Sequence, residues 1–177
     1  MGKVMSRIRP TFIVIGLALV SAGLDQFTKS LVRNSLQLGK TWVPIPALAS
    51  VFDITRTSNT GVAFGMFPNA GLFVTMIAFV VIVAIIYYSF TIEREQWLIA
   101  VALGLQLGGA IGNLTDRLRL GPVTDFFHVH NFPIFNVADA SISTGVAILA
   151  LLLVFEARSG TAPQPVETAA PEPDTPV

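Results

Sequence analysis

Four stretches of apolar residues dominate the pattern of this chain, and polar residues gather between them and at their ends. The apolar stretches cover residues 11–24, 70–90, 97–112 and 140–155. A helix that crosses a membrane needs about 20 mostly apolar residues. The second stretch reaches that length alone, and the others reach it if each helix continues through polar residues at one end. We therefore predict four membrane-spanning helices, over about residues 11–32, 69–91, 96–117 and 136–157.

The segment between the first two spans has a different pattern. Residues 36–67 contain short alternating, strand-like pieces and the turn-former Gly61, which favour a small β-rich element on the membrane surface. Residues 119–133 are expected to be a shorter loop that joins spans three and four on the same side. The predicted fold class is an all-α membrane protein with four transmembrane helices and a small extracytoplasmic β-rich element between helices 1 and 2. The membrane domain would cover residues 1–158, and the Pro-rich residues 159–177 predict a disordered cytoplasmic tail.

Composition supports a membrane protein. Of the 177 residues, 53% are hydrophobic and 12% are charged, whereas about 25% are charged in a typical soluble domain. The net charge is zero, which argues against nucleic acid as a partner. The chain has no cysteine, so disulfides, thiolate metal sites and a cysteine nucleophile are excluded.

The basic residues before the first span set the predicted orientation. Lys3, Arg7 and Arg9 precede that span, which places the N-terminus in the cytoplasm. Four spans then return the C-terminus to the cytoplasm. The first stretch also resembles a cleavable signal peptide, but three more spans follow it, and the helix can continue through residues 25–29. An uncleaved first helix fits better.

With this topology, nearly all polar groups at membrane depth fall at the outer ends of the spans. Ionisable groups at that depth usually face a bundle interior or a cavity. Gly108 and Gly112 have the spacing that lets helices pack closely, which would bring the polar end of span three near its neighbours. Asn136 and Asp139 are three residues apart and would share a helix face. The converging residues are Asp25, Lys29, Asn59, Asn113, Asp116, Arg117, Asp125, Asn136 and Asp139.

Two neighbouring carboxylates in a partly dry site share a proton, which suits acid–base hydrolysis of an amide. Asp125 and Asp139 are the best candidates for such a pair. For Asp25 with Lys29, and for Asp116 with Arg117, the nearby cations favour a structural role.

Histidine offers one further possibility. Asp125, His128 and His130 could supply three metal ligands, because alternate residues of a strand point to one face. Histidines at the headgroup level of the membrane are the simpler interpretation, and we favour it.

Two other classes of function are weaker. A proton- or ion-coupled transporter would carry polar groups through the whole membrane depth, whereas here they stop at one side. A structural or assembly subunit gives no reason for clustered aspartates.

Five motifs, taken in order, resemble the lipoprotein signal peptidase (signal peptidase II) family of bacterial inner membranes. They cover about residues 11–158 and are D-Q-F-T-K at 25–29, N-T-G-V-A-F at 59–64, G-N-L-T-D-R at 112–117, V-T-D-F-F at 123–127 and F-P-I-F-N-V-A-D at 132–139. The segment from Asp125 to Asp139 is short for the family, and the Pro-rich tail lies outside the family pattern.

The resemblance implies a membrane aspartic endopeptidase that needs no metal or other cofactor. It would cut the signal peptide from a prolipoprotein just before a diacylglyceryl-modified cysteine, on the periplasmic side of the inner membrane. The expected partners are that substrate and membrane lipid, and a monomer is expected. Asp125 and Asp139 would form the catalytic dyad. The expected supporting residues are Asp25, Lys29, Asn59, Gly61, Asn113, Arg117 and Asn136.

Overall fold

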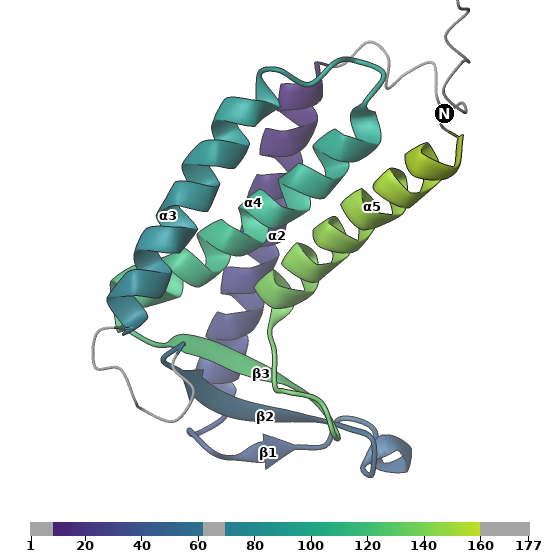
Figure 1. The fold of residues 1–177 in the computed structure, drawn as a ribbon. Helices are drawn as coiled ribbons and strands as arrows, with labels where there is room; N and C mark the ends of the chain where they lie inside the picture. Colours follow the sequence, from purple (N-terminus) through teal and green to yellow (C-terminus); the bar gives the residue numbers. More distant parts are fainter. Residues whose placement is uncertain (1–8, 62–69, 160–177) are drawn as a thin grey trace, which may run out of the picture.

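The computed structural model describes residues 9–61 and 70–159, which form four long helices with a small sheet at one end (Figure 1). This agrees with the predicted fold class. The predictions for residues 62–67 and for the Pro-rich tail concern residues outside the described ranges, apart from Ser159 at the end of the last helix. The helices are α2 (Pro10–Ser35), α3 (Ala70–Ser89), α4 (Trp97–Leu120) and α5 (Val137–Ser159).

All four helices are long and apolar enough to cross a membrane. Helix α3 carries no charged residue, and large apolar side chains such as Phe73, Phe79 and Val80 are at least 60% exposed on it. A soluble monomer rarely exposes apolar surface on this scale. We therefore expect membrane lipid to cover these exposed apolar side chains.

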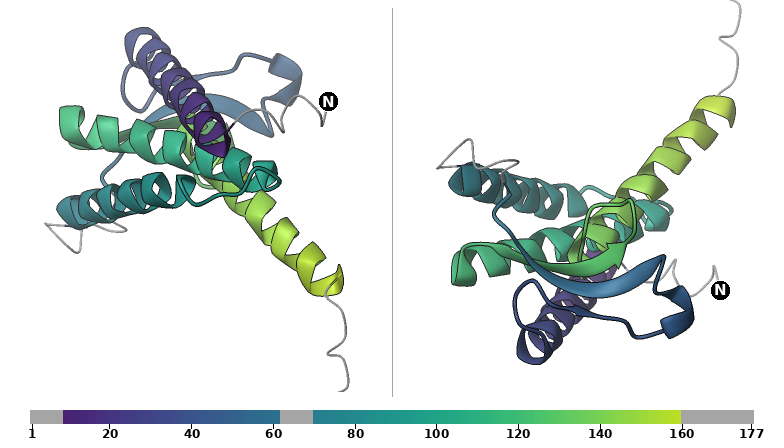
Figure 2. Two further views of the ribbon diagram at one scale, coloured as in Figure 1. Left: turned by 90° about the horizontal axis from the view of Figure 1, so that it is seen from above. Right: turned by 90° about the horizontal axis from the view of Figure 1, so that it is seen from below.

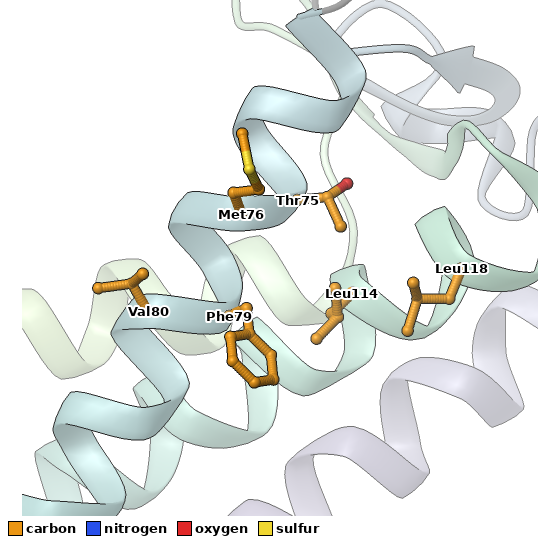
Figure 3. A pocket seen from close by; sticks show the side chains of 6 residues that line it. All are labelled: Thr75, Met76, Phe79, Val80, Leu114 and Leu118. Carbon is orange, nitrogen blue, oxygen red and sulfur yellow. The ribbon is translucent and has the colours of Figure 1, made fainter.

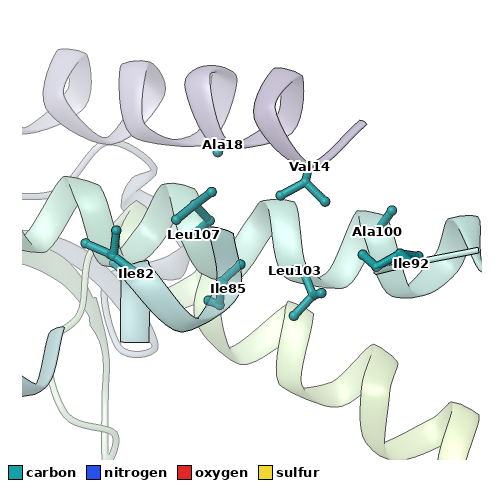
Figure 4. Close-up of a cluster of buried hydrophobic side chains, with 9 residues drawn as sticks. Val14, Ala18, Ile82, Ile85, Ile92, Ala100, Leu103 and Leu107 are labelled. Carbon is teal, nitrogen blue, oxygen red and sulfur yellow. The ribbon is translucent and has the colours of Figure 1, made fainter. Parts of the chain in front are cut away.

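Helix α4 is the centre of the bundle, with α2, α3 and α5 packed around it (Figure 2). Of its most apolar 18 residues, 56% are buried, against 22% or less for the other helices. The buried apolar cluster joins α2, α3 and α4 in the half of the bundle away from the sheet (Figure 4). Its labelled members are Val14, Ala18, Ile82, Ile85, Ile92, Ala100, Leu103 and Leu107.

Glycines on α4 permit the close approach that their spacing predicted. A Cβ on Gly108 would lie 2.6 Å from Cβ of Ser21 and 2.7 Å from the carbonyl oxygen of Ala18, both on α2. A Cβ on Gly112 would lie 2.5 Å from Oδ2 of Asp25. On the other side of α4, a Cβ on Gly109 would meet the carbonyl oxygen of Ala138 on α5. Both neighbours therefore pack directly against the α4 backbone.

The sheet has three antiparallel strands in the order β1-β2-β3. Strands β1 (Thr41–Trp42) and β2 (Phe52–Asn59) follow α2, as the sequence indicated. Strand β3 (Val123–Val129) follows α4 and lies within residues 119–133, so the prediction that this segment is only a loop was wrong. The sheet forms because β3 supplies backbone partners to β2 from a distant part of the chain, which a local pattern does not reveal.

The sheet lies across the end of the bundle where α2 and α4 end and where α3 and α5 begin (Figure 1). Thr57 of β2 pairs with Asp125 of β3, after an irregularity in the register between Ile54 and Thr57. Strand β3 thus carries Asp125 to the end of the bundle where Asn113 and Asp139 lie on their helices.

The glycine contacts generate a prediction for stability. Gly108→Ala should lower the free energy of unfolding by about 1–3 kcal/mol, because the new methyl group overpacks the interface with α2. Thermal unfolding in detergent, followed by tryptophan fluorescence, measures the change. Gly23→Ala is the matched control, since a Cβ there meets nothing within 4 Å and alanine favours a helix. Equal melting temperatures for both variants would contradict the packing argument.

Candidate active site

Asp125 occupies a buried position on β3, with its side chain held by two amide groups. Asn136 donates from Nδ2 to Oδ1 of Asp125 at 2.6 Å, and Asn59 donates from Nδ2 to Oδ2 at 2.9 Å. Burial raises the pKa of the Asp125 carboxyl above its ordinary value; the hydrogen bond from Asn59 opposes this rise and the nearby charge of Asp139 adds to it. This carboxyl is therefore suited to hold a proton.

Asp139 lies in the first turn of α5 and is half-buried. Asn113 of α4 donates from Nδ2 to its Oδ1 at 2.8 Å. The backbone N–H of Asn136 donates to Oδ2 of Asp139 at 3.1 Å, and the N–H of Asp139 donates back to Oδ1 of Asn136 at 3.0 Å. This reciprocal pair resembles a capping box. The predicted span beginning at residue 136 had implied that Asn136 lies on a face of α5. The structure instead places it before the helix, as the residue that caps it.

The side-chain amides of Asn59, Asn113 and Asn136 each have a fixed orientation, because a hydrogen-bond donor contacts the amide oxygen. The oxygen of Asn113 accepts from Nζ of Lys29 at 2.8 Å, and lysine is a donor only. The oxygen of Asn59 accepts from the N–H of Gly61 at 2.7 Å, and that of Asn136 accepts from the N–H of Asp139. The NH₂ groups must then point toward Asp125 and Asp139. Asn136 also donates to Asn113 at 3.1 Å, which joins the two halves of the site.

Asp25 and Lys29 form a fully buried ion pair beneath these amides. Nζ of Lys29 lies 2.8 Å from Oδ2 of Asp25, and both side chains are 0% exposed. The other oxygen of Asp25 accepts from the backbone N–H of Ala138 at 2.9 Å. The pair thus connects α2 to Asn113 on α4 and to the first turn of α5.

Asp116 belongs to the same buried layer, but its partners differ from those the sequence suggested. It accepts from the N–H of Thr124 at 2.9 Å and lies 3.5 Å from Lys29 and 3.4 Å from Arg33. Arg117 is not among its ion-pair partners within the described residues. Neighbouring residues of a helix point in different directions, so closeness in sequence was misleading here.

Three further residues complete this buried polar layer, and sequence reasoning did not single them out: Gln26, Arg33 and Thr124. Gln26 donates from Nε2 to Asp116 at 3.1 Å and to the carbonyl of Gly112 at 3.0 Å. Arg33 donates to the hydroxyl of Thr124 at 3.2 Å. The signal that could have found Arg33 is the i, i+4 spacing that continues the buried stripe from Asp25 through Lys29.

Arg117 and Gly61 lie at the edge of the site toward α3. The half-buried guanidinium of Arg117 interacts electrostatically with Asp139 and Asp125, and its Nε has no partner among the described residues. Gly61 has a φ of +76°, and a Cβ there would lie 3.8 Å from Nη2 of Arg117. Glycine is suited to this left-handed conformation, which aims the Gly61 N–H at Asn59.

The two histidines lie elsewhere on the sheet. Both contact Asp53, at 3.1 Å for Nδ1 of His128 and 2.9 Å for Nε2 of His130. Asp125, which the sequence offered as a possible third ligand beside the two histidines, is not part of this group. Asp125 is separated from the histidines because its side chain is held by Asn59 and Asn136.

The arrangement is suited to acid–base chemistry on an amide. Each carboxylate is held at both oxygens by neutral donors, with Asn136 linking the two. Asp139 is half-buried and Asn59 is exposed, so the site opens on that side. Within residues 9–61 and 70–159, the one three-residue group placed to hold a metal is Asp53, His128 and His130, which does not include either of these aspartates.

Known proteins resemble the chain in sequence. The family model for signal peptidase (SPase) II matches residues 17–155. The lipoprotein signal peptidase of Bacillus subtilis (strain 168) is 42% identical over 144 residues, which cover 79% of this chain and 92% of that protein. The lipoprotein signal peptidase of Symbiobacterium thermophilum is 41% identical over 152 residues, or 84% of this chain and 98% of that protein.

Solved structures show the same fold. A bacterial membrane enzyme solved by the in meso method superposes with a TM-score of 0.75 at 28% identity, covering 85% of this chain and 93% of that one. A second such enzyme gives a TM-score of 0.74 at 30% identity, covering 80% and 92%. The chain is a multi-pass membrane protein of bacteria, and its sequence and fold together show that it belongs to the signal peptidase II family of membrane aspartic peptidases.

Proposed function

We propose that this lipoprotein signal peptidase cleaves diacylglyceryl-modified prolipoproteins just before the lipidated cysteine, with Asp125 and Asp139 as its catalytic dyad. The observation that carries the proposal is the set of three amides, Asn59, Asn113 and Asn136, whose NH₂ groups are turned toward those two carboxylates. Membership of the signal peptidase II family supports the substrate class.

In the proposed mechanism, the ionised aspartate of the pair removes a proton from a water molecule. That water attacks the carbonyl carbon before the cysteine, while the protonated aspartate donates a hydrogen bond to the carbonyl oxygen. A proton then passes to the leaving amine. The raised pKa of the Asp125 carboxyl favours a pair that holds one proton.

The supporting residues act by positioning the two aspartates or by altering their electrostatic surroundings. Lys29 fixes Asn113, which holds Asp139, and Gly61 fixes Asn59, which holds Asp125. Asp25 compensates the charge of Lys29 and binds the N–H of Ala138, one residue before Asp139. Arg117 supplies a positive charge that acts electrostatically on both aspartates, and such a charge would stabilise a developing oxyanion.

Apolar grooves beside the site suit a lipidated substrate. A groove of about 400 Å³ lies between α3 and α4 (Figure 3). A second, of about 580 Å³, lies between the end of α2 and the sheet, where it is lined by Leu31, Trp42, Phe126 and other residues. The signal helix and the acyl chains would occupy such surfaces. Confinement at the membrane interface would then position the scissile bond, which lowers the entropic barrier to attack.

We propose the orientation that the first span predicts, with both termini in the cytoplasm and the sheet and dyad on the periplasmic side of the inner membrane. The basic residues before α2 support it. All residues of the site come from one chain, which supports a monomer. We retain residues 1–158 as the membrane peptidase domain, with the tail as a cytoplasmic extension.

The dyad is tested by removing one acid at a time. Asp125→Asn and Asp139→Asn should each reduce cleavage of a diacylglyceryl-modified prolipoprotein by about 10²–10⁴-fold, the range that general acid–base catalysis contributes. Cleavage is measured by gel shift with purified enzyme in detergent.

Glu95→Gln is the matched control, because it also replaces an acid by its amide and lies exposed in the turn between α3 and α4. It should cleave at the wild-type rate. Thermal unfolding shows that each variant is folded. Turnover within about tenfold of wild type by a folded Asp125→Asn or Asp139→Asn would remove that residue from the dyad.

The lipid requirement is tested with one precursor in two forms. The diacylglyceryl-modified form should be cleaved at the bond before the cysteine, and the unmodified form should remain uncut at the same enzyme concentration. Mass spectrometry of the product identifies the bond. Equal cleavage of both forms would contradict the proposed role of the lipid.

Orientation is testable because the chain lacks cysteine. In spheroplasts, a membrane-impermeant maleimide should label Lys40→Cys, which lies beside the sheet, and should label Glu95→Cys only after the membrane is permeabilised. Both positions are exposed. The reverse labelling pattern would overturn the orientation.

A further inference from the structure

Three potential metal ligands converge on the sheet, away from the dyad. Asp53 of β2 and His128 of β3 are cross-strand partners, and His130 lies two residues farther along, on the same face as His128. Oδ2 of Asp53 is 3.1 Å from Nδ1 of His128 and 2.9 Å from Nε2 of His130. All three ligand atoms lie within 4.8 Å of one another.

We propose that Asp53, His128 and His130 bind a divalent transition metal, with Zn²⁺ as the best match, at a structural site separate from the dyad. Zinc binds imidazole nitrogen and carboxylate oxygen at about 2.0–2.2 Å in tetrahedral geometry. Ligand atoms around such an ion lie about 3.3 Å apart. The two distances from Asp53 are close to that value. The three ligand atoms lie within 4.8 Å of one another, so binding requires the two imidazole nitrogens to move toward each other.

The surroundings of Asp53 prepare it as a ligand. The hydroxyl of Thr55 donates to Oδ1 at 2.6 Å. Nδ1 of His128 lies near both oxygens, at 3.2 Å from Oδ1 and 3.1 Å from Oδ2, and Nε2 of His130 lies near Oδ2. In metal sites, hydrogen bonds of the kind that Thr55 donates to a ligand's side chain fix its orientation toward the ion.

Exposure provides a path for the ion. The side chain of Asp53 is 9% exposed, while those of His128 and His130 are 31% and 35% exposed. Ile54 and Phe127 pair across the same two strands and line the groove against α2. His128 and His130 are not among the residues that line this groove, and alternation along the strand directs His128 to the side opposite its neighbour Phe127. A fourth coordination position would be open to water.

The location suggests what the metal would do. Pairing of β2 and β3 is irregular between Ile54 and Thr57. The Asn59–Asp125 hydrogen bond lies on one side of this irregularity, and the Asp53 group lies on the other. An ion bound at Asp53 would link β2 to β3 at the end of their pairing that lies away from Asp125. It would thereby stabilise the strand that carries Asp125 without contacting the substrate.

The histidine content makes the test unambiguous. The chain has two histidines, and both belong to the proposed site. Full-length enzyme with a histidine-free affinity tag, stripped of metal and held in detergent, is titrated with Zn²⁺ against a chromophoric chelator. We expect one Zn²⁺ per chain with a micromolar or lower Kd. X-ray absorption of the zinc-loaded protein should show two imidazole nitrogens.

Variants assign the ligands. The double variant His128→Gln/His130→Gln should lose stoichiometric zinc, and Asp53→Asn should bind at least tenfold more weakly. Asp125→Asn is the control, because it removes an acid on the same strand outside the site, and it should bind zinc like the wild type. Zinc should raise the melting temperature of the wild type and leave that of the double histidine variant unchanged.

Several results would overturn the proposal. These are absence of stoichiometric zinc in the wild type, unchanged binding in the double histidine variant, or loss of binding in Asp125→Asn. If chelation abolished peptide cleavage below the melting temperature of the metal-free enzyme, the assignment of a purely structural role would be wrong. If the wild type bound no stoichiometric zinc, the contacts of Asp53 with His128 and His130 would be hydrogen bonds only. The zinc measurements need no peptidase activity, so they stand apart from the test of the dyad.

Discussion

The buried ammonium group of Lys29 is the interaction on which the active end of this molecule depends. A charged group that is 0% exposed is tolerated only with partners, and removing one partner of a buried pair costs about 3–5 kcal/mol. Lys29 meets that requirement with Asp25 on its own helix and with Asn113 on α4. Asp25 in turn binds the start of α5. One desolvated charge thereby sets three helices in register and turns the Asn113 amide toward Asp139.

This arrangement requires the helix backbones to be very close. Residues with small or no side chains provide that closeness along one side of α4, where Gly108 contacts Ala18 and Ser21, and Gly112 contacts the carboxylate of Asp25. The buried stripe of α2 changes along its length from apolar residues to Asp25 and Lys29. The bundle is consequently held by dispersion contacts at one end and by hydrogen bonds and ion pairs at the other. Lipid covers the remaining apolar faces, and a membrane strengthens the polar contacts because little water competes for them.

The sheet completes the site from outside the helices. Asp125 and Asn59 belong to strands that are far apart in sequence, and their side chains meet because β2 and β3 pair. The helices supply Asn113 and Asp139, and the turn before α5 supplies Asn136, which contacts both aspartates. An amide can serve in this position since it donates from one end and accepts at the other. The proposed dyad is thus assembled from a strand and a helix, with neutral donors that hold each carboxylate without neutralising it.

The sequence by itself determined the four apolar helices, the strands after the first helix, the gathering of polar residues at one end and the motifs of the family. Hydrophobic length and local spacing are properties of contiguous residues, so a pattern reveals them. Tertiary structure alone decided that residues 123–129 form a strand, that Asn136 is a cap, that Asp116 pairs with Lys29 and Arg33, and that the histidines meet Asp53. Each of these depends on which distant segments come into contact. Hydrogen-bond partners, unlike hydropathy, are chosen by that packing in three dimensions.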